Sequence, residues 1–190
     1  MLCDFPHMNA LLEVPAIRER VMKFSVEDYH RFTEGQPTEL LRGTIIQKMS
    51  KSPAHQFFID RLRKILAEQI SPEFIVRTEG PITTEDSEPE PDVIVLRGPL
   101  EKYRHAHAET AELVVEIAVS SLEIDRVKAL IYAEAGVREY WIVCPEEKRV
   151  EVYRQPGAQG YGERTDFAAP AVLESSALPG VRVELAALFC

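Results

Sequence analysis

The stretch LVVEIAV, residues 113–119, is the most apolar strand candidate in the chain, and a single acid, Glu116, interrupts it. A second apolar run, VIVL at 93–96, directly follows Asp92. Unbroken aliphatic and β-branched runs of this length predict strands that are covered on both faces of a sheet. Both carboxylates then lie partly out of water, where an unpaired charge is costly. Each therefore needs a partner, which can be a lysine or arginine, a hydrogen-bond donor or a metal ion.

The two acids say more together than separately. Taken singly, Asp92 could cap a turn, and Glu116 could pair with a lysine or lie on an edge strand. If the two strands are neighbours, however, their carboxylates repel each other unless a proton or a divalent cation lies between them. Magnesium is the hard cation that such an oxygen-rich pair predicts.

The remaining patterns predict a mixed α/β fold, with a mixed central sheet flanked by helices. We expect helices over residues 24–32, 54–70 and 122–135, and two short strands within 38–50 that turn at Arg42-Gly43. Further strands are expected at EFIVRT, PDVIVL, LVVEIAV, EYWIVC and RVEVYR, with one more in the C-terminal tail. Because no repeat or long linker divides the chain, we expect a single domain over residues 1–190, with residues 1–23 as an N-terminal extension.

Composition excludes several classes of protein. No apolar stretch approaches the roughly 20 residues that a membrane span requires. The first residues lack the basic end and unbroken apolar stretch of a secretory signal. The odd number and wide spacing of the cysteines argue against a disulfide framework or a cysteine-rich zinc site: Cys3, Cys144 and Cys190. We therefore expect a cytoplasmic protein that does not associate with membranes.

Charge is distributed unevenly along the chain. The formal net charge of −9 argues against tight, unspecific binding to a polyanion. Residues 17–64 nevertheless carry ten lysines and arginines against six acids, whereas residues 73–92 carry seven acids and one arginine. A basic region beside an acid-rich centre would suit a metal-dependent enzyme that acts on an anionic substrate. Ordinary solvated faces would explain the same charges equally well.

The acids and the segments around them carry a family resemblance. The order Glu39, Pro91-Asp92 and Glu116 resembles the PD-(D/E)XK nuclease superfamily, which has the restriction-endonuclease-like fold. From about residue 24 to the C-terminus, the chain is similar to the bacterial Uma-two family of endonuclease-like proteins. The matching segments are ELLRG (39–43), SPAHQ (52–56), LVVEIAVSS (113–121), then Asp125, Lys128 and Tyr132, and AGVREYWIVCP (135–145).

The resemblance implies a catalytic role for each matching residue. Asp92 and Glu116 would bind one or two Mg²⁺ or Mn²⁺ ions, and Glu39 would add a third acid. The superfamily usually places a lysine two residues after the strand glutamate, where this chain has Ala118. The resemblance implies that Lys128, on the following helix, supplies the amine instead. Two plainer readings stay open: Glu39 as a surface acid paired with an arginine, and Lys128 as an exposed helical lysine.

Two smaller features accompany this pattern. His55 also matches the family, although a histidine at a helix start can simply cap the helix or pack there. Cys144 stands before a proline where family members commonly have aspartate. The segment between Glu116 and Lys128 is slightly shorter than is usual in the family, which bears on whether Lys128 can reach the acids.

Two functions are compatible with the sequence. The first is a metal-dependent endonuclease that hydrolyses DNA phosphodiester bonds, for which Glu39, Asp92, Glu116 and Lys128 would be catalytic. The second is a non-catalytic module, with a homodimer as its expected state, that keeps the nuclease fold and binds nucleic acid or protein. Ala118 favours the second, whereas three acids and a lysine held together favour the first.

Overall fold

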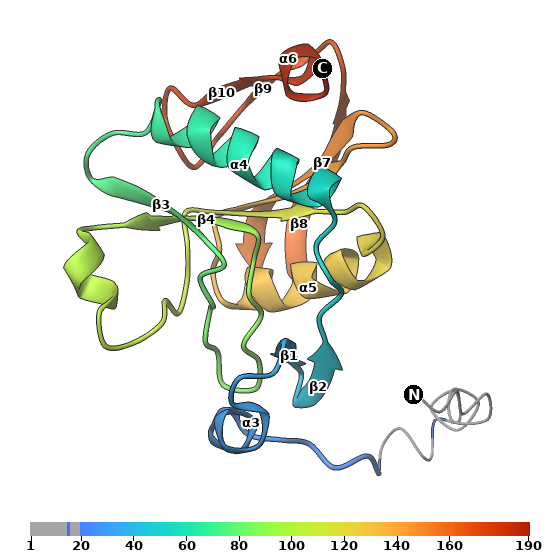
Figure 1. The fold of residues 1–190 in the computed structure, drawn as a ribbon. Coiled ribbons are helices and arrows are strands. Elements are labelled where there is room, and N and C mark those ends of the chain that lie inside the picture. Colours follow the sequence, from blue (N-terminus) through green and yellow to red (C-terminus); the bar gives the residue numbers. More distant parts are fainter. Residues whose placement is uncertain (1–14, 16–19) are drawn as a thin grey trace.

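A computed structural model describes residue 15 and residues 20–190 of the chain (Figure 1). The expected N-terminal extension, residues 1–23, falls mostly outside the described residues. A six-stranded sheet forms the centre of the structure. In order across the sheet, its strands are β3 (Phe74–Thr78), β4 (Val93–Arg97), β5 (Leu113–Ile117), β6 (Glu139–Cys144), β7 (Arg149–Gly157) and β8 (Gly160–Ala168). Only β5 and β6 pair in parallel within this sheet, so it is mixed, as predicted.

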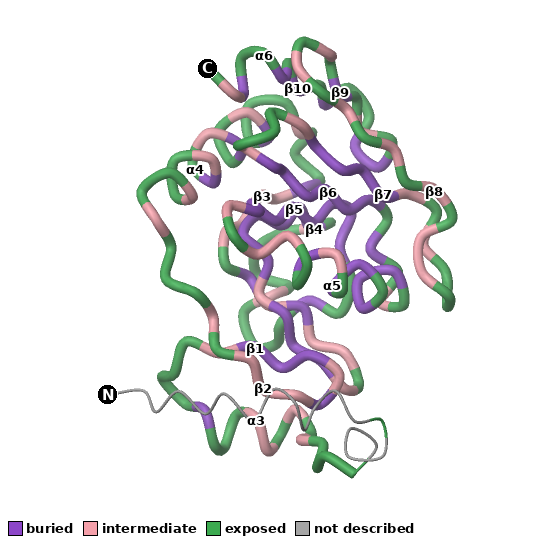
Figure 2. Tube along the Cα trace, turned by 90° about the vertical axis from the view of Figure 1, so that its right-hand side faces the viewer, coloured by how far each residue is buried: buried purple, intermediate pink, exposed green. Residues whose placement is uncertain are grey.

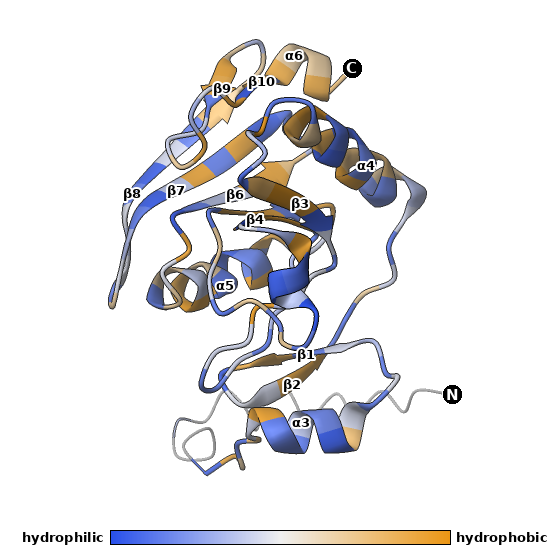
Figure 3. Cartoon of the chain, turned by 90° about the vertical axis from the view of Figure 1, so that its left-hand side faces the viewer, coloured by the Kyte–Doolittle hydropathy of each residue, from blue (hydrophilic) through white to orange (hydrophobic). Residues whose placement is uncertain are grey.

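The three central strands are buried along their whole apolar length, which explains their continuous hydrophobic sequence. Side chains alternate between the two faces of the sheet. Along β4, Val93 and Val95 join one hydrophobic cluster, and Ile94 and Leu96 join the other. Figure 2 shows the buried residues concentrated in these strands, and Figure 3 shows β7 and β8 alternating between hydrophilic and hydrophobic positions.

One helix packs on each face of the sheet. Helix α4 (Pro53–Ala67) buries its apolar side against the first cluster, through Ile59, Leu62 and Leu66. Ser52 caps this helix by accepting a hydrogen bond from the His55 amide, 3.2 Å away. Helix α5 (Leu122–Glu134) covers the opposite face and connects β5 to β6, as a parallel pair requires (Figure 1).

A separate hairpin lies beside the sheet, next to helix α3 (Val26–Thr33) (Figure 1). It consists of β1 (Thr38–Leu41) and β2 (Thr44–Gln47), which pair in antiparallel register. The predicted turn at Arg42-Gly43 is present, with φ angles of 51° and 70°. Positive φ at both central positions is the conformation that tight hairpin turns need. The Glu88 amide donates to the Leu40 carbonyl at 2.7 Å, which attaches the hairpin to the loop between β3 and β4.

The C-terminal part of the chain returns to α4. It forms β9 (Val172–Glu174), β10 (Arg182–Glu184) and α6 (Leu185–Leu188). The remaining element is a short 3₁₀ turn, η1 (Leu100–Tyr103), between β4 and β5. Arg61 of α4 donates to the Cys190 carbonyl at 2.8 Å. Within the described residues, none of the helices has the length and apolar character that crossing a bilayer would need.

Candidate functional site

Asp92 and Glu116 lie side by side in the structure. The antiparallel pairing of β4 with β5 sets Val93 opposite Val115, which brings the preceding Asp92 next to Glu116. The Asp92 amide donates to Glu116 Oε2 at 3.3 Å, and the Ile117 amide donates to Asp92 Oδ2 at 2.8 Å. Both carboxylates are buried. The two acids therefore share the enclosed position that their strands predicted.

Lys128 enters the same site from helix α5. Its Nζ lies 3.0 Å from Glu116 Oε1 and 3.0 Å from Glu39 Oε1. Tyr132, one helical turn further on, donates from its hydroxyl to Glu116 Oε1 at 2.9 Å. The reading of Lys128 as an exposed lysine is wrong, because its side chain is only 6% exposed. The α5 face that carries Asp125, Lys128 and Tyr132 points at the sheet.

Glu39 reaches the site from the hairpin strand β1. Its Oε1 accepts hydrogen bonds from the Glu90 amide at 2.7 Å and from Lys128 at 3.0 Å. Glu39 is buried, so the reading of it as a surface acid paired with an arginine is also wrong. The structure thus brings Glu39, Asp92, Glu116 and Lys128 to one place, from β1, the start of β4, β5 and α5.

A small cavity of about 150 Å³ lies over these four side chains. Asp125, Lys51 and His55 also line it. Lys51 Nζ lies 3.3 Å from Asp92 Oδ1, and His55 Nε2 lies 3.0 Å from Asp92 Oδ2. His55 is therefore a neighbour of the acids as well as a residue of the helix start. Lys51 was not singled out by the sequence, since it lies in an irregular segment with no periodic pattern.

Electrostatics in this cavity is governed by buried carboxylates. Burial raises the pKa of Glu116 well above its ordinary value; Lys128 lowers it in part, and three nearby carboxylates raise it further. Burial likewise raises the pKa of Asp125 to about 6, against the opposing effects of Lys128 and the Ser121 hydroxyl. Asp92 differs, because His55 and the Ile117 amide outweigh burial and lower its pKa.

Burial and the neighbouring carboxylates have opposite effects on the pKa of the two lysines. Burial alone would lower the pKa of Lys128, but the carboxylates of Glu116, Glu39 and Asp125 outweigh it and raise the pKa. The Lys51 pKa is also raised, because its contacts with Glu79 and Asp92 outweigh burial. Both amines therefore stay protonated at neutral pH and act as counter-ions to the acids.

The donor set suits a hard divalent cation, since Glu39, Asp92, Glu116 and Asp125 provide carboxylate oxygens around one cavity. Across residue 15 and residues 20–190, however, no three histidine, cysteine or acidic side chains are already gathered in a metal-binding arrangement. Lysines and a histidine contact the carboxylate oxygens instead. The residues therefore fit Mg²⁺ or Mn²⁺ in ligand chemistry, provided that an ammonium group moves away from the carboxylate oxygen that the cation would bind.

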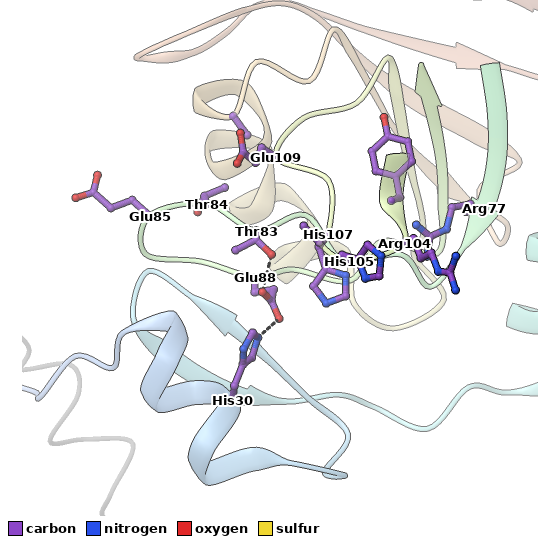
Figure 4. A pocket seen from close by; sticks show the side chains of 13 residues that line it. His30, Arg77, Thr83, Thr84, Glu85, Glu88, Arg104, His105, His107 and Glu109 are labelled. Carbon is purple, nitrogen blue, oxygen red and sulfur yellow. Dashed lines mark hydrogen bonds and ion pairs between the residues drawn. The ribbon is translucent and has the colours of Figure 1, made fainter. Parts of the chain in front are cut away.

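A larger hollow, with a volume of about 830 Å³, lies elsewhere, between α3 and the loops that flank β4 (Figure 4). His30 Nε2 lies 2.7 Å from Glu88 Oε1, whose other oxygen accepts from Thr83 at 2.6 Å. The other residues that line this hollow include exposed polar side chains of these loops, such as Arg104 and His105. The buried acids and the enclosed lysine line the smaller cavity, which is therefore the candidate site.

Comparisons with known proteins show which family and which fold this chain has. The family model described as "Uma2: Putative restriction endonuclease" matches residues 26–187. One solved structure, described as the "Crystal structure of a putative nuclease belonging to DUF820 from Anabaena variabilis ATCC 29413", superposes with a TM-score of 0.74. That alignment has 20% sequence identity and covers 87% of this chain and 97% of the other, and it shows a shared fold. The comparison with curated proteins gave no match.

Proposed function

The chain belongs to the Uma2 family, and from that premise we propose that it is a metal-dependent endonuclease that hydrolyses phosphodiester bonds in DNA. One observation carries the proposal: the Lys128 ammonium lies 3.0 Å from the carboxylates of both Glu39 and Glu116, next to Asp92. A buried lysine among acids from separate elements is a costly arrangement, and such arrangements concentrate at active sites. We treat the chain as one catalytic domain.

Asp92 and Glu116 are the residues that would hold Mg²⁺ or Mn²⁺. When bound, the cation would lower the pKa of a water molecule and offset negative charge on the scissile phosphate. Glu39 would hold Lys128 in place through their ion pair. Lys128 would donate hydrogen bonds to the attacking water or to a phosphoryl oxygen, and its positive charge would stabilise the transition state.

This assignment gives Lys128 the task that the superfamily usually assigns to a lysine at the position of Ala118. Support comes from the reach of the side chain, because α5 lies over the sheet and Lys128 contacts Glu116 directly. The chain is acidic overall, so we expect DNA to be held mainly by local contacts at the cavity, where Lys51 lies. We place the enzyme in the cytoplasm, where free thiols such as those of Cys144 and Cys190 are stable.

One observation favours the non-catalytic alternative. Lys51 already pairs with Asp92, Lys128 pairs with Glu116, and His55 contacts Asp92, so the cluster can stand as a structural network without a metal ion. In that case the protein would be a binding module, with a homodimer as its expected form. Metal binding and cleavage distinguish the two functions.

The test is digestion of supercoiled and single-stranded DNA by the purified protein in Mg²⁺ or Mn²⁺. We expect Asp92→Ala, Glu116→Ala and Lys128→Ala each to lower the cleavage rate by about 100-fold or more, because the residues act as a unit. Glu123→Gln is the matched control, since Glu123 lies on α5 with its side chain 87% exposed. It should cleave like the wild type.

A melting curve for each protein, with and without metal, separates lost chemistry from lost folding. Metal should raise the melting temperature of the wild type, since a ligand bound only by the folded state stabilises it, and Asp92→Ala should abolish this response. Cleavage that persists in Asp92→Ala would indicate a contaminating nuclease. A wild type that neither cleaves DNA nor responds to metal would support the binding module.

A further inference from the structure

Lys51 occupies an unusual place among the cations of the site. It lies in the irregular segment between β2 and α4 and lines the cavity that contains the acids. Its Nζ lies 2.6 Å from Glu79 Oε1 and 3.3 Å from Asp92 Oδ1. The Lys51 side chain is 30% exposed, whereas that of Lys128 is 6% exposed. Of the two ammonium groups that contact Asp92 or Glu116, that of Lys51 is thus accessible to solvent, while that of Lys128 is enclosed.

The two oxygens of Asp92 have different partners. Oδ2 accepts from the Ile117 amide at 2.8 Å and contacts His55 Nε2 at 3.0 Å. These partners belong to the sheet and to the start of α4, so they fix Oδ2 in position. Oδ1 faces Lys51. A cation bound by Asp92 would therefore take the place of Lys51 at Oδ1, with Oδ2 still held by the protein.

Glu79 provides a second partner that keeps Lys51 nearby. It directly follows β3, and its amide donates to the Asp92 carbonyl at 3.4 Å. Its φ angle of 55° is uncommon for a residue other than glycine, and such conformations concentrate at functional sites. If Lys51 left Asp92, its contact with Glu79 would hold the ammonium at the mouth of the cavity.

We propose that Lys51 is an exchangeable counter-ion, which neutralises Asp92 in the metal-free protein and contacts a backbone phosphate of the nucleic acid when a divalent cation is bound. The inference rests on the proposed nuclease function and adds a substrate contact to it. Lys51 acts as a positioning residue: it neutralises Asp92 in the metal-free site, and then it orients the strand. Lys128 cannot exchange in this way, because it is enclosed by Glu39 and Glu116.

The first measurement is Mn²⁺ binding by isothermal titration calorimetry. Lys51→Gln should bind Mn²⁺ about fivefold more tightly than the wild type, because a competing cation has been removed from Asp92 and partly exposed ion pairs contribute about 1 kcal/mol. Lys48→Gln is the matched control. Lys48 lies in the same segment and lines the same cavity, but it pairs with Glu90 at 2.7 Å. Its Mn²⁺ affinity should equal that of the wild type.

The second measurement is binding of a short DNA duplex by fluorescence anisotropy, in Ca²⁺ to slow cleavage and in EDTA. In Ca²⁺, Lys51→Gln should bind DNA less tightly, and the slope of log affinity against log salt should fall by about one unit. In EDTA, the variant should bind DNA like the wild type, because Lys51 of the wild type is then paired with Asp92. Tighter metal binding together with weaker DNA binding is a combination that a purely structural lysine would not produce.

Each outcome decides between the proposals. If the wild type binds Mn²⁺ and Lys51→Gln binds it no more tightly, the exchange is overturned while the nuclease proposal stands. Equal DNA affinity of wild type and Lys51→Gln in Ca²⁺ would overturn the phosphate contact. A wild type that binds no Mn²⁺ would overturn both the exchange and the proposed metal site. Melting curves recorded beforehand show that the compared variants are folded.

Discussion

At the scale of single residues, the buried lysine determines what the site can do. An ammonium group out of water is costly, and Lys128 is tolerated because Glu39, Glu116 and Asp125 surround it. The carboxylates depend on the lysine equally, since they would otherwise repel each other in a small space. Lys128 therefore contributes to the stability of the fold as well as to the proposed chemistry.

Replacing Lys128 by methionine should lower the free energy of unfolding by about 3–5 kcal/mol, because the carboxylates of Glu116 and Glu39 lose their buried partner. Urea denaturation at pH 7 measures this loss. The double variant Lys128→Met with Glu116→Gln should recover part of this loss in free energy, since one of the two buried carboxylates without a partner is then neutral. A loss below 1 kcal/mol, or strictly additive effects in the double variant, would contradict the coupling.

Sequence reasoning located the acids better than the cations. Asp92 directly precedes one buried strand and Glu116 lies within another, and the apolar runs of both strands can be read directly. The sequence left open whether Lys128 is exposed, because α5 inverts the usual pattern: apolar Val127 and Leu130 are exposed, while Lys128 is buried. Lys51 could not be predicted, because its position depends on the path of an irregular segment rather than on a period.

At the scale of elements, the hairpin β1–β2 decides whether Glu39 reaches the site. Glu39 is the second residue of β1 and pairs with Ile46 across the hairpin. The turn that joins the strands has little space for a side chain at Gly43, where an added Cβ would lie 2.9 Å from Lys23 Cβ. The position of a proposed catalytic acid therefore depends on a glycine outside the cavity.

Gly43→Ala should destabilise the hairpin by about 1–2 kcal/mol through left-handed backbone strain, with the contact to Lys23 adding to the loss. Cleavage should fall as Glu39 shifts, and thermal unfolding with a DNA-digestion assay measures both effects. The control is Gly180→Ala, which has a similar φ of 86° but open space around it. It should lose stability and keep cleavage activity. Equal loss of activity in both variants would show that the hairpin turn does not control the position of Glu39.

At the scale of the whole molecule, a second ion network joins the helical layer to the far strands of the sheet. Glu151 of β7 is fully buried and pairs with Arg126 of α5, Arg149 of β7 and Arg164 of β8. Burial would raise the pKa of Glu151, but hydrogen bonds from Arg126 and Arg149 outweigh it and lower the pKa to about 2. The helix that carries Lys128 is thus held to the sheet by an acid unrelated to the proposed chemistry.

This network predicts how stability depends on pH. Because the folded-state pKa of Glu151 lies below its unfolded value, its contribution is present above pH 4.5 and is lost as the pH falls from about 4.5 to about 2. The full loss should be about 3 kcal/mol. Urea midpoints at pH 5 and pH 3 should therefore differ less in Glu151→Gln than in the wild type. Equal differences would show that other groups dominate acid unfolding.

The parallel pairing of β5 with β6 has a consequence for how such a site can change over generations. A parallel pair obliges the chain to cross one face of the sheet, and here the crossover helix α5 lies where Lys128 and Tyr132 contact Glu116. Ala118 packs in the same cluster as Tyr132 of this helix, so a long side chain at 118 would compete with α5 for space. The fold therefore offers two alternative positions for one amine, one on the strand β5 and its extension and one on the crossover helix α5. If Lys128 acts as we propose, related chains could lose a lysine at position 118 once α5 carries one, and the ammonium group would then come from a different element while the acids stay in place.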